Sequence, residues 1–561
     1  MVDTRISIGA IGVAALLLVV WFGVRTTLGL ETGTVEAVVE PSGPPTAEEA
    51  AAAQQRTEPA TVLSGPADVL RMGVLDPVPA DPAAVTGGRV DADIVADLLY
   101  DGLTTVAPGS TEVEPALAES FEASDDGLTW RFRLRQDATF SDGTPVDADD
   151  VIASFERVAA GGAESLVALR LESVSGFEEF AIDETTDRLT GLVAQDPFTV
   201  DVNLTEPFAD LPALLAGPSF GVAPESVAPG LLLDGTIAPR QLATSGPMKV
   251  VAVDEDSVVL RPVDPGSVGV ASVYLERYTE ADAAFDAFVD GELDWAMVPS
   301  TRVDEDLSGI GRQAFSDFHA ELFYALELEN PTFADRRFRR AIVHAVDRDA
   351  IVAEVLGEGA TALDGVVPGG LSGYRGASCA GVCDHDPDAA ERIVNGLYPD
   401  GDVPTISVDT LDGDVEEAVA EAVAADLEAV GIPTEVRVLS LPEFEAAKTA
   451  GELELYHYGW VGSYPSPDAY LGPNFASTSL DNGVGLASDV VDEALAAARS
   501  TEDLTARLAR YAGVEEEVLR LSPIVPIAQL KARVALSDRV GGYSPRLDGT
   551  FPIEAITIGQ R

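Results

Sequence analysis

The segment between Leu117 and Val158 limits what this chain can fold into more than any other stretch, because its residues indicate a strand, the turns beside it and the start of a helix. Residues 128–135, LTWRFRLR, alternate apolar and polar side chains, which is typical of a strand with one buried face. The turns on either side contain Asp-Gly steps, where glycine accepts a positive φ. Asp147 then precedes four apolar residues that share one helical face, Val151, Ile152, Phe155 and Val158. The segment therefore predicts a strand, a turn and a capped amphipathic helix in succession.

Four short motifs follow one another in this segment: LAES, SDDGLTWRFRLR, F-x-DGTP and DADDVIASFERV. Their order and spacing resemble the signature region of the family 5 extracytoplasmic solute-binding proteins, the peptide, oligopeptide, dipeptide and nickel receptors of ABC importers. The resemblance implies an α/β fold of the periplasmic-binding-protein class II type, in which two large lobes surround a ligand cleft and a smaller domain is added. It also implies binding without covalent chemistry, so we expect neither enzyme activity nor a cofactor.

Other stretches are similar to the same family, so that the resemblance covers about residues 69–558. They include the predicted hairpin over residues 245–263 and the apolar strand PIVPIAQLKARVAL near the C-terminus. The resemblance implies the following division: lobe I from residues 67–90, 191–312 and 526–561, the small domain II from residues 91–190, and lobe III from residues 313–525.

Two elements of the expected lobe III can be read from the residues themselves. Residues 406–410 and 433–439 resemble parallel strands on either side of a helix over 415–430, which is a βαβ unit. Residues 335–356 predict one long helix that is rich in arginine. Because the chain is so acidic, we expect these arginines to be paired and solvated rather than to form an anion site.

The N-terminus predicts a membrane anchor and hence the compartment. Residues 6–24 carry no charge, are flanked by Arg5 and Arg25, and are long enough to span a bilayer. We predict an uncleaved signal-anchor within residues 1–25, followed by a flexible linker over residues 26–66; a cleaved secretory signal is the alternative. No cysteine precedes Cys379, which excludes a lipoprotein anchor. The folded part is thus expected on the extracytoplasmic face of the membrane.

The formal net charge of -60 excludes some partners. The only lysines are Lys249, Lys448 and Lys531, so a basic patch for nucleic acid or for an anionic bilayer surface is disfavoured. An acidic surface of this kind is typical of proteins that work where salt screens self-repulsion. We therefore expect the stability of the protein to rise with salt concentration.

Cys379 and Cys383 are the only cysteines, and they stand four positions apart. Outside the cytoplasm, such a pair predicts a small-loop disulfide. His385 lies close by in the sequence, so a metal site is the alternative, but two sulfurs and one imidazole lack a fourth ligand. We predict the disulfide and no metal.

The candidate ligand residues lie in the stretch 453–475, LELYHYGWVGSYPSPDAYLGPNF. A strand there leads into a loop rich in aromatic residues, glycine and proline, which favours a rigid binding surface. In the resembled family the matching loop lines the cleft, and its aspartate takes the ammonium of the ligand; this chain has Ser463 there. We predict that the ligand is contacted by Gly459, Trp460, Ser463, Tyr464 and Asp468, with Asp468 as the nearest replacement acid. The alternative is that Trp460 and Tyr464 only pack the lobe.

The predicted function is that of an ABC importer receptor that binds peptides in the cleft between the lobes and delivers them to a permease. Three alternatives remain: a receptor of the same fold for a non-peptide solute or a metal chelate, an anchored sensor or scaffold that does not transport, and a hydrolase. The hydrolase rests on Ser219 in the G-x-S-x-G sequence of residues 217–221. Because that sequence follows a predicted helix and Pro224 comes soon after, we interpret it as a loop.

Overall fold

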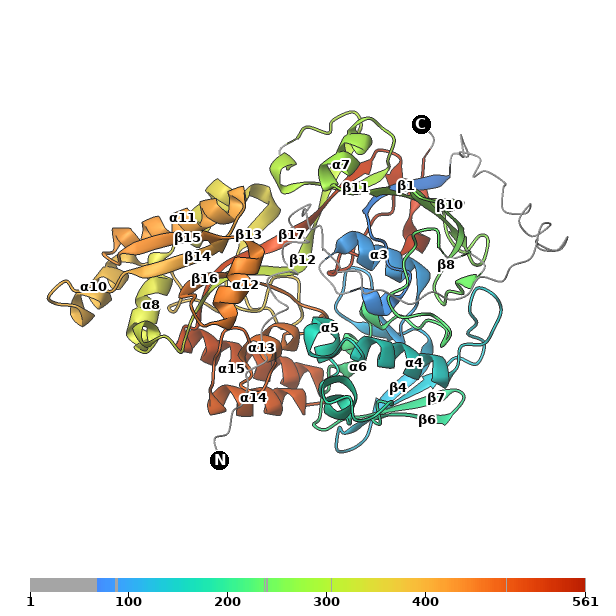
Figure 1. The fold of residues 1–561 in the computed structure, drawn as a ribbon, viewed down its shortest axis with the longest axis horizontal. Helices are drawn as coiled ribbons and strands as arrows, with labels where there is room; N and C mark the ends of the chain where they lie inside the picture. Colours follow the sequence, from blue (N-terminus) through green and yellow to red (C-terminus); the bar gives the residue numbers. More distant parts are fainter. Residues whose placement is uncertain are drawn as a thin grey trace, which may run out of the picture.

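The computed structural model describes residues 68–559, apart from 86–88, 237, 239–240, 304 and 481. Two large lobes are joined by long strands, and a smaller domain lies beside one of them (Figure 1). The predicted anchor and linker, residues 1–25 and 26–66, lie outside the described residues. Within the described ranges, no helix combines the length and the apolar character that crossing a membrane requires.

One mixed sheet of eleven strands runs through both large lobes in the order β15-β14-β16-β12-β17-β11-β1-β10-β9-β8, with β13 (Ala360–Ala362) paired to β17 off this path. Two of its strands are long enough to serve both lobes, β12 (Gly311–Leu326) and β17 (Ile524–Ser537). β17 pairs with β11 of lobe I, with β13 of lobe III and with β12. The register of β12 against β17 shifts between Asp317 and Glu321, so the ladder is irregular where it passes between the lobes.

Lobe I is built around β1 (Val69–Leu75), which pairs parallel with β10 (Ser272–Tyr278) and β11 (Trp295–Met297). The predicted hairpin is confirmed as β8 (Met248–Val253) and β9 (Ser257–Pro262). Two helices pack on these strands, α3 (Val90–Leu99) and α7 (Ala281–Val289).

The small domain contains the strand and helix predicted from residues 117–158. Its sheet has the order β4 (Ala118–Ala123), β5 (Thr129–Leu134), β7 (Thr199–Asn203) and β6 (Leu192–Asp196). Asp147 caps α4 (Ala148–Ala159) by accepting hydrogen bonds from the backbone of Asp149 and Asp150, and the predicted apolar face of α4 is buried. The sheet extends past the boundary expected at residue 190, because β6 and β7 pair with β5.

Lobe III has helices on both faces of its part of the sheet (Figure 1). The predicted βαβ unit is confirmed: β14 (Ile406–Leu411) and β15 (Thr434–Leu439) are parallel and are joined by α11 (Asp414–Ala429). β14 also pairs parallel with β16 (Leu455–Val461), which follows α12 (Leu441–Thr449). Three helices lie on the other side: α13 (Asp468–Phe475), α14 (Asp489–Arg499) and α15 (Leu504–Leu521).

The single helix expected over residues 335–356 is wrong. α8 (Arg336–Ala345) ends at Val346, which has an extended backbone. The side chain of Asp347 accepts a hydrogen bond from the backbone of Ala350 and starts the short helix α9 (Arg348–Ile351), while its own backbone N–H donates to Asp426 on α11. A local cap and a contact with a distant helix thus divide the periodic pattern.

Cys379 and Cys383 form a disulfide in a loop that packs on α8 and α9. Arg340 donates to the carbonyl of Gly381, and Arg348 donates to the carbonyl of Cys383. His344 Nδ1 lies 2.8 Å from the carbonyl oxygen of Asp384. Basic side chains of the helices therefore bind the carbonyl groups of this loop.

Candidate functional site

A pocket lies where the order of the lobe III strands changes direction. From β14 the chain passes through α11 to β15 on one side, and then through α12 back to β16 on the other side. In open α/β sheets such a switch point leaves a crevice at the carboxyl ends of the strands, where ligands bind. Leu411, the last residue of β14, and Gly459, near the end of β16, both line the pocket there.

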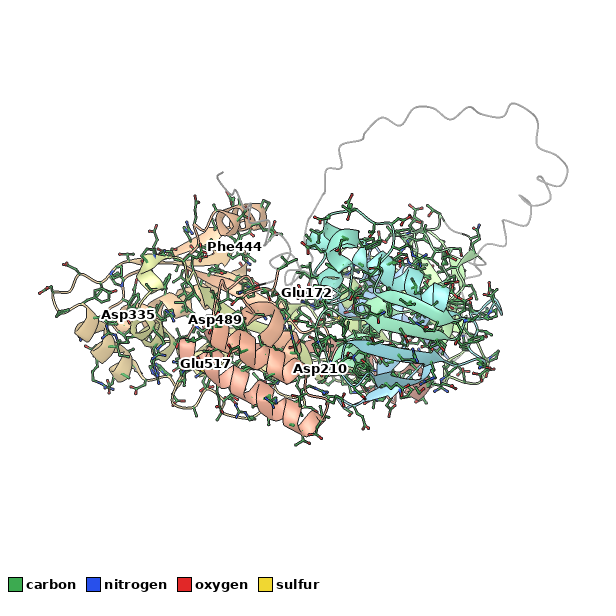
Figure 2. The ribbon with its side chains drawn as sticks, turned by 90° about the horizontal axis from the view of Figure 1, so that it is seen from below. Glu172, Asp210, Asp335, Phe444, Asp489 and Glu517 are labelled. Carbon is green, nitrogen blue, oxygen red and sulfur yellow. A yellow bond between two sulfur atoms is a disulfide. The ribbon has the colours of Figure 1, made fainter. Side chains whose placement is uncertain are left out.

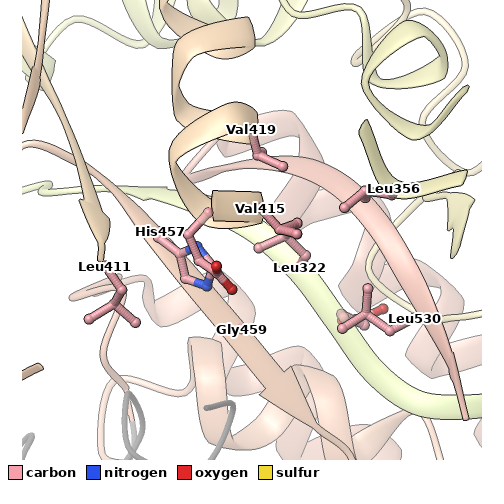
Figure 3. Close-up of a pocket in the computed structure, with 10 residues that line it drawn as sticks. Leu322, Leu356, Leu411, Val415, Val419, His457, Gly459 and Leu530 are labelled. Atoms are coloured by element: carbon pink, nitrogen blue, oxygen red, sulfur yellow. The ribbon is translucent and has the colours of Figure 1, made fainter. Parts of the chain in front are cut away.

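The space not filled by atoms at the pocket, its open mouth included, is about 470 Å³, and the walls are largely apolar (Figure 3). His457 and Gly459 face it from β16, since residues two apart on a strand point to the same side. Leu322 lies opposite Gly459 on β12. The apolar walls come from β12, β14, α11, β17 and the segment before β13: Leu322, Leu356, Leu411, Val415, Val419 and Leu530.

Three polar side chains of this pocket carry atoms without a hydrogen-bond partner among the described residues: Glu321 Oε1, Glu416 Oε2 and His457 Nδ1. Glu416 stands in the first turn of α11 and is only 7% exposed. Burial raises the pKa of its carboxyl to about 7, and the charges of Asp412, Asp414 and Glu417 act in the same direction. Burial lowers the pKa of His457 to about 4, so this imidazole is neutral at pH 7.

Glu321 of β12 is a further acid at the pocket. It is 1% exposed, and its Oε1 has no hydrogen-bond partner in the described part of the chain. Burial and the nearby carboxylate of Glu515 raise the pKa of Glu321 well above its usual value. Glu515 in turn accepts hydrogen bonds from the backbone of Val366 and Val367, which holds the loop after β13 against α15.

Of the residues predicted to contact a ligand, the structure brings only Gly459 to this pocket. Trp460 is the next residue along β16 and therefore points to the other side of the sheet. Its indole Nε1 donates to the carbonyl of Ala469 at 2.7 Å, and the guanidinium of Arg170 lies 5.0 Å from its ring centre. Arg170, which follows α5 (Leu166–Leu169) in the small domain, also donates to Ser463 Oγ at 3.1 Å.

Tyr464 and Asp468 belong to a buried polar network of lobe III, at its junction with the small domain. Arg499 Nε and Nη2 donate to the two carboxylate oxygens of Asp468 at 2.8 and 3.1 Å, and the Tyr464 hydroxyl donates to Asp468 Oδ2 at 2.7 Å. The carboxyl group of Asp468 is 1% exposed. Both of its oxygens are thus occupied, so Asp468 would have to give up Arg499 before it could take a ligand ammonium.

The same junction includes Asp210, which lies just after the small domain in the sequence. Its carboxylate accepts a hydrogen bond from the Tyr511 hydroxyl at 2.9 Å and lies 3.2 Å from Arg507 Nε. Figure 2 shows Asp210 and Glu172 where the ribbon of the small domain meets α13, α14 and α15. A second hollow of about 400 Å³ lies here, lined by Glu172, Phe208, Tyr464 and Arg499 among others.

Sequence reasoning missed the polar groups of the lobe III pocket. His457 lies within the stretch 453–475, and the period of two in its strand would have placed His457 and Gly459 on one face. Glu416 gave a weaker signal, because one acid among several at a helix start is an ordinary helix feature. Only the packing of α11 against the sheet distinguishes it.

Ser219 and the cysteine pair can also be placed. Ser219 is buried in a short 3₁₀ turn, Pro218–Phe220, and its hydroxyl donates to the carbonyl of Val85 at 2.7 Å. It therefore acts as a structural hydrogen-bond donor. Cys379 and Cys383 are joined to each other, so their sulfurs are not thiolate ligands, and His385 Nδ1 lies 3.0 Å from Asp347.

Two α/β lobes that share strands β12 and β17, with a pocket at the switch point of one lobe, define a solute-binding protein of the periplasmic class II type. Residues 112–482 match the family described as bacterial extracellular solute-binding proteins, family 5 Middle. The chain belongs to this family.

Individual proteins are similar over most of the chain. Di/tripeptide-binding protein 2 of Pseudomonas aeruginosa is 28% identical over 492 residues, which cover 82% of this chain and 90% of that protein. Heme-binding protein A of Haemophilus influenzae is 24% identical, with 83% and 88% covered. Among solved structures, the unliganded open form of MppA, a periplasmic murein tripeptide binding protein, superposes with a TM-score of 0.74 at 21% identity and covers 88% of this chain and 97% of that chain.

Proposed function

We propose that this protein is the receptor of an ABC importer, which captures a peptide at the lobe III pocket and presents it to a permease on the extracytoplasmic side. The observation that carries the proposal is the pocket at the carboxyl ends of β14 and β16, next to the two strands that join the lobes. The name of the di/tripeptide-binding relative supports peptides as the ligand class.

Capture requires that the ligand favour a closed arrangement of the lobes over an open one. β12 and β17 are the structural basis for such a hinge, because both lobes are built on them. The irregular register of β12 between Asp317 and Glu321 is a point where the ladder can bend. A ligand that contacts both lobes shifts the equilibrium only by its difference in affinity for the two states, and no bond is made or broken.

A non-peptide solute is the second candidate, and one observation favours it. The loop that carries Ser463 and Asp468 offers no available carboxylate, since Asp468 is paired with Arg499 and Ser463 accepts a hydrogen bond from Arg170. A ligand ammonium would need a different acid, whereas a solute without an ammonium would need none. The name of the haem-binding relative supports a ligand other than a peptide.

Native mass spectrometry of the purified protein, before and after mild denaturation, tests both candidates. We expect released masses that resolve into short peptides. A single non-peptide mass would favour the second candidate. A protein that carries nothing, and then binds no member of a peptide library, would contradict peptide capture.

The proposal includes anchoring by residues 6–24, which leaves residues 26–66 as a tether for the receptor. Full-length protein expressed in a bacterium should then sediment with membranes and resist extraction by alkaline carbonate, and a variant that begins at residue 67 behind a cleavable signal should be soluble. Release of the full-length protein by carbonate would contradict the anchor.

A further inference from the structure

The lobe III pocket has an unusual chemical make-up for a hollow with apolar walls. Its sides are leucine and valine, but Glu416 Oε2 is buried and accepts no hydrogen bond from a described residue. Leaving a buried carboxyl oxygen without a partner is costly, because the group loses its water and gains nothing in exchange. A buried acceptor that lines a pocket is therefore a group whose partner can come from a ligand.

The charges around Glu416 decide what kind of partner fits. Asp412, Asp414 and Glu417 come from its own turn and helix, and all three act on its carboxyl as like charges. Across the pocket, β16 contributes His457, which is neutral at pH 7, and β12 contributes Glu321, a further buried acid. The residues that line the pocket include no lysine and no arginine. An anionic group would thus be repelled there, while a cation would gain from every acid nearby.

From this arrangement we infer that the pocket selects a basic side chain of the captured peptide, lysine or arginine, whose hydrocarbon stem lies against the leucine and valine walls and whose cationic end donates to Glu416. The inference rests on the proposed peptide receptor and specifies its ligand. Lysine and arginine have this shape, with an apolar stem and a charged tip. The closing of the pocket around the stem removes water from the ion pair, which strengthens the pair.

The titration of Glu416 adds a second signature. With its pKa near 7, part of the protein carries a protonated Glu416 at neutral pH, and a cation can pair only with the ionised form. Binding of a lysine peptide should therefore release protons at pH 7, and its affinity should rise from pH 6 to pH 8. A peptide with norleucine in place of lysine has the same stem without the charge, and its affinity should not follow this pH dependence.

The test uses short alanine peptides that carry lysine, norleucine or glutamate at each position in turn, titrated calorimetrically into the full-length protein. For the best position, we expect lysine to bind about 10- to 100-fold more tightly than norleucine, and glutamate to bind weakest. Glu416→Gln keeps the shape and removes the charge, so it should abolish the preference by weakening the lysine peptide alone. Glu421→Gln is the matched control, because Glu421 is an exposed acid on the same helix that neither lines the pocket nor acts on the charge of Glu416.

The outcomes distinguish a failure of the basic pocket from a failure of the peptide receptor. Equal affinities for lysine and norleucine, or a preference that survives Glu416→Gln, would overturn the basic pocket and leave the peptide receptor standing. If the native protein binds none of these peptides, both the receptor proposal and the basic pocket fail. Thermal unfolding of each variant with and without peptide confirms that a lost preference does not reflect a lost fold.

Discussion

Replacing Arg499 by methionine tests the buried ion pair that joins α14 to α13 in lobe III. Arg499 supplies two of the three hydrogen bonds that the buried carboxylate of Asp468 accepts. Hydrogen bonds to charged groups contribute about 1.5–3 kcal/mol each, so their loss is bounded at about 3–6 kcal/mol. Removing one member of a buried ion pair costs about 3–5 kcal/mol by the same reasoning. We therefore expect the free energy of unfolding of Arg499→Met to fall by about 4 kcal/mol.

The assay is guanidinium-induced unfolding followed by circular dichroism, with the first transition compared between variants because the protein has more than one lobe. Arg510→Met is the control: Arg510 is exposed on α15, and its loss should change the free energy by less than about 0.5 kcal/mol. A triple variant, Tyr464→Phe, Asp468→Leu and Arg499→Met, removes all three polar partners at once and should recover most of the loss. A loss below about 1 kcal/mol for Arg499→Met, or a triple variant as unstable as the single one, would refute the reasoning.

Three further predictions concern stability. In the folded protein the pKa of Glu416 is raised from 4.5 to about 7, so the native protein loses stability as pH rises from 4.5 through 7. Glu416→Gln should therefore unfold like the native protein at pH 4.5. In urea titrations at pH 8 it should be more stable than the native protein by up to about 3 kcal/mol. Because the protein has a net charge of -60, salt should screen the repulsion among its acidic groups, and its melting temperature should rise between about 0.05 and about 2 M potassium chloride. A melting temperature in calorimetry that does not change with salt would contradict this. Replacing Cys379 and Cys383 by serine removes the loop that the disulfide closes in the unfolded chain, so the free energy of unfolding should fall by about 2 kcal/mol. An unchanged denaturation midpoint would show that the disulfide contributes nothing.

The sequence predicted elements best where the signal was local and repeated. The strand of residues 128–135 and the cap at Asp147 depend on neighbours a few positions away, and the structure has them as β5 and α4. The βαβ unit around α11 was predictable for the same reason, since an alternation of strand and helix periods marks it.

Long-range contacts decided the parts that the sequence did not predict. The sheet of the small domain includes the pair of β5 with β7, some 70 positions further on, and no local signal predicts that pairing. The carboxylate of Asp468 is occupied by Arg499, which is 31 residues away in the sequence, and no spacing rule predicts that the two side chains pair. Glu416 differs from the other acids of its turn only in being buried against the sheet. Tertiary packing gave these residues their roles.

The position of β17 also determines when each lobe can be completed during biosynthesis. β17 pairs with β11 in lobe I and with β13 in lobe III, yet it is among the last strands to leave the ribosome. About 200 residues of chain separate it from its partner β12, which at 5–20 residues per second corresponds to roughly 10–40 s of synthesis. Throughout that interval, one edge of β12 remains without its final partner. A chain truncated before Ile524 would leave both lobes with an open sheet edge, so proteolytic quality control should recognise C-terminal truncations more readily than the loss of a surface loop.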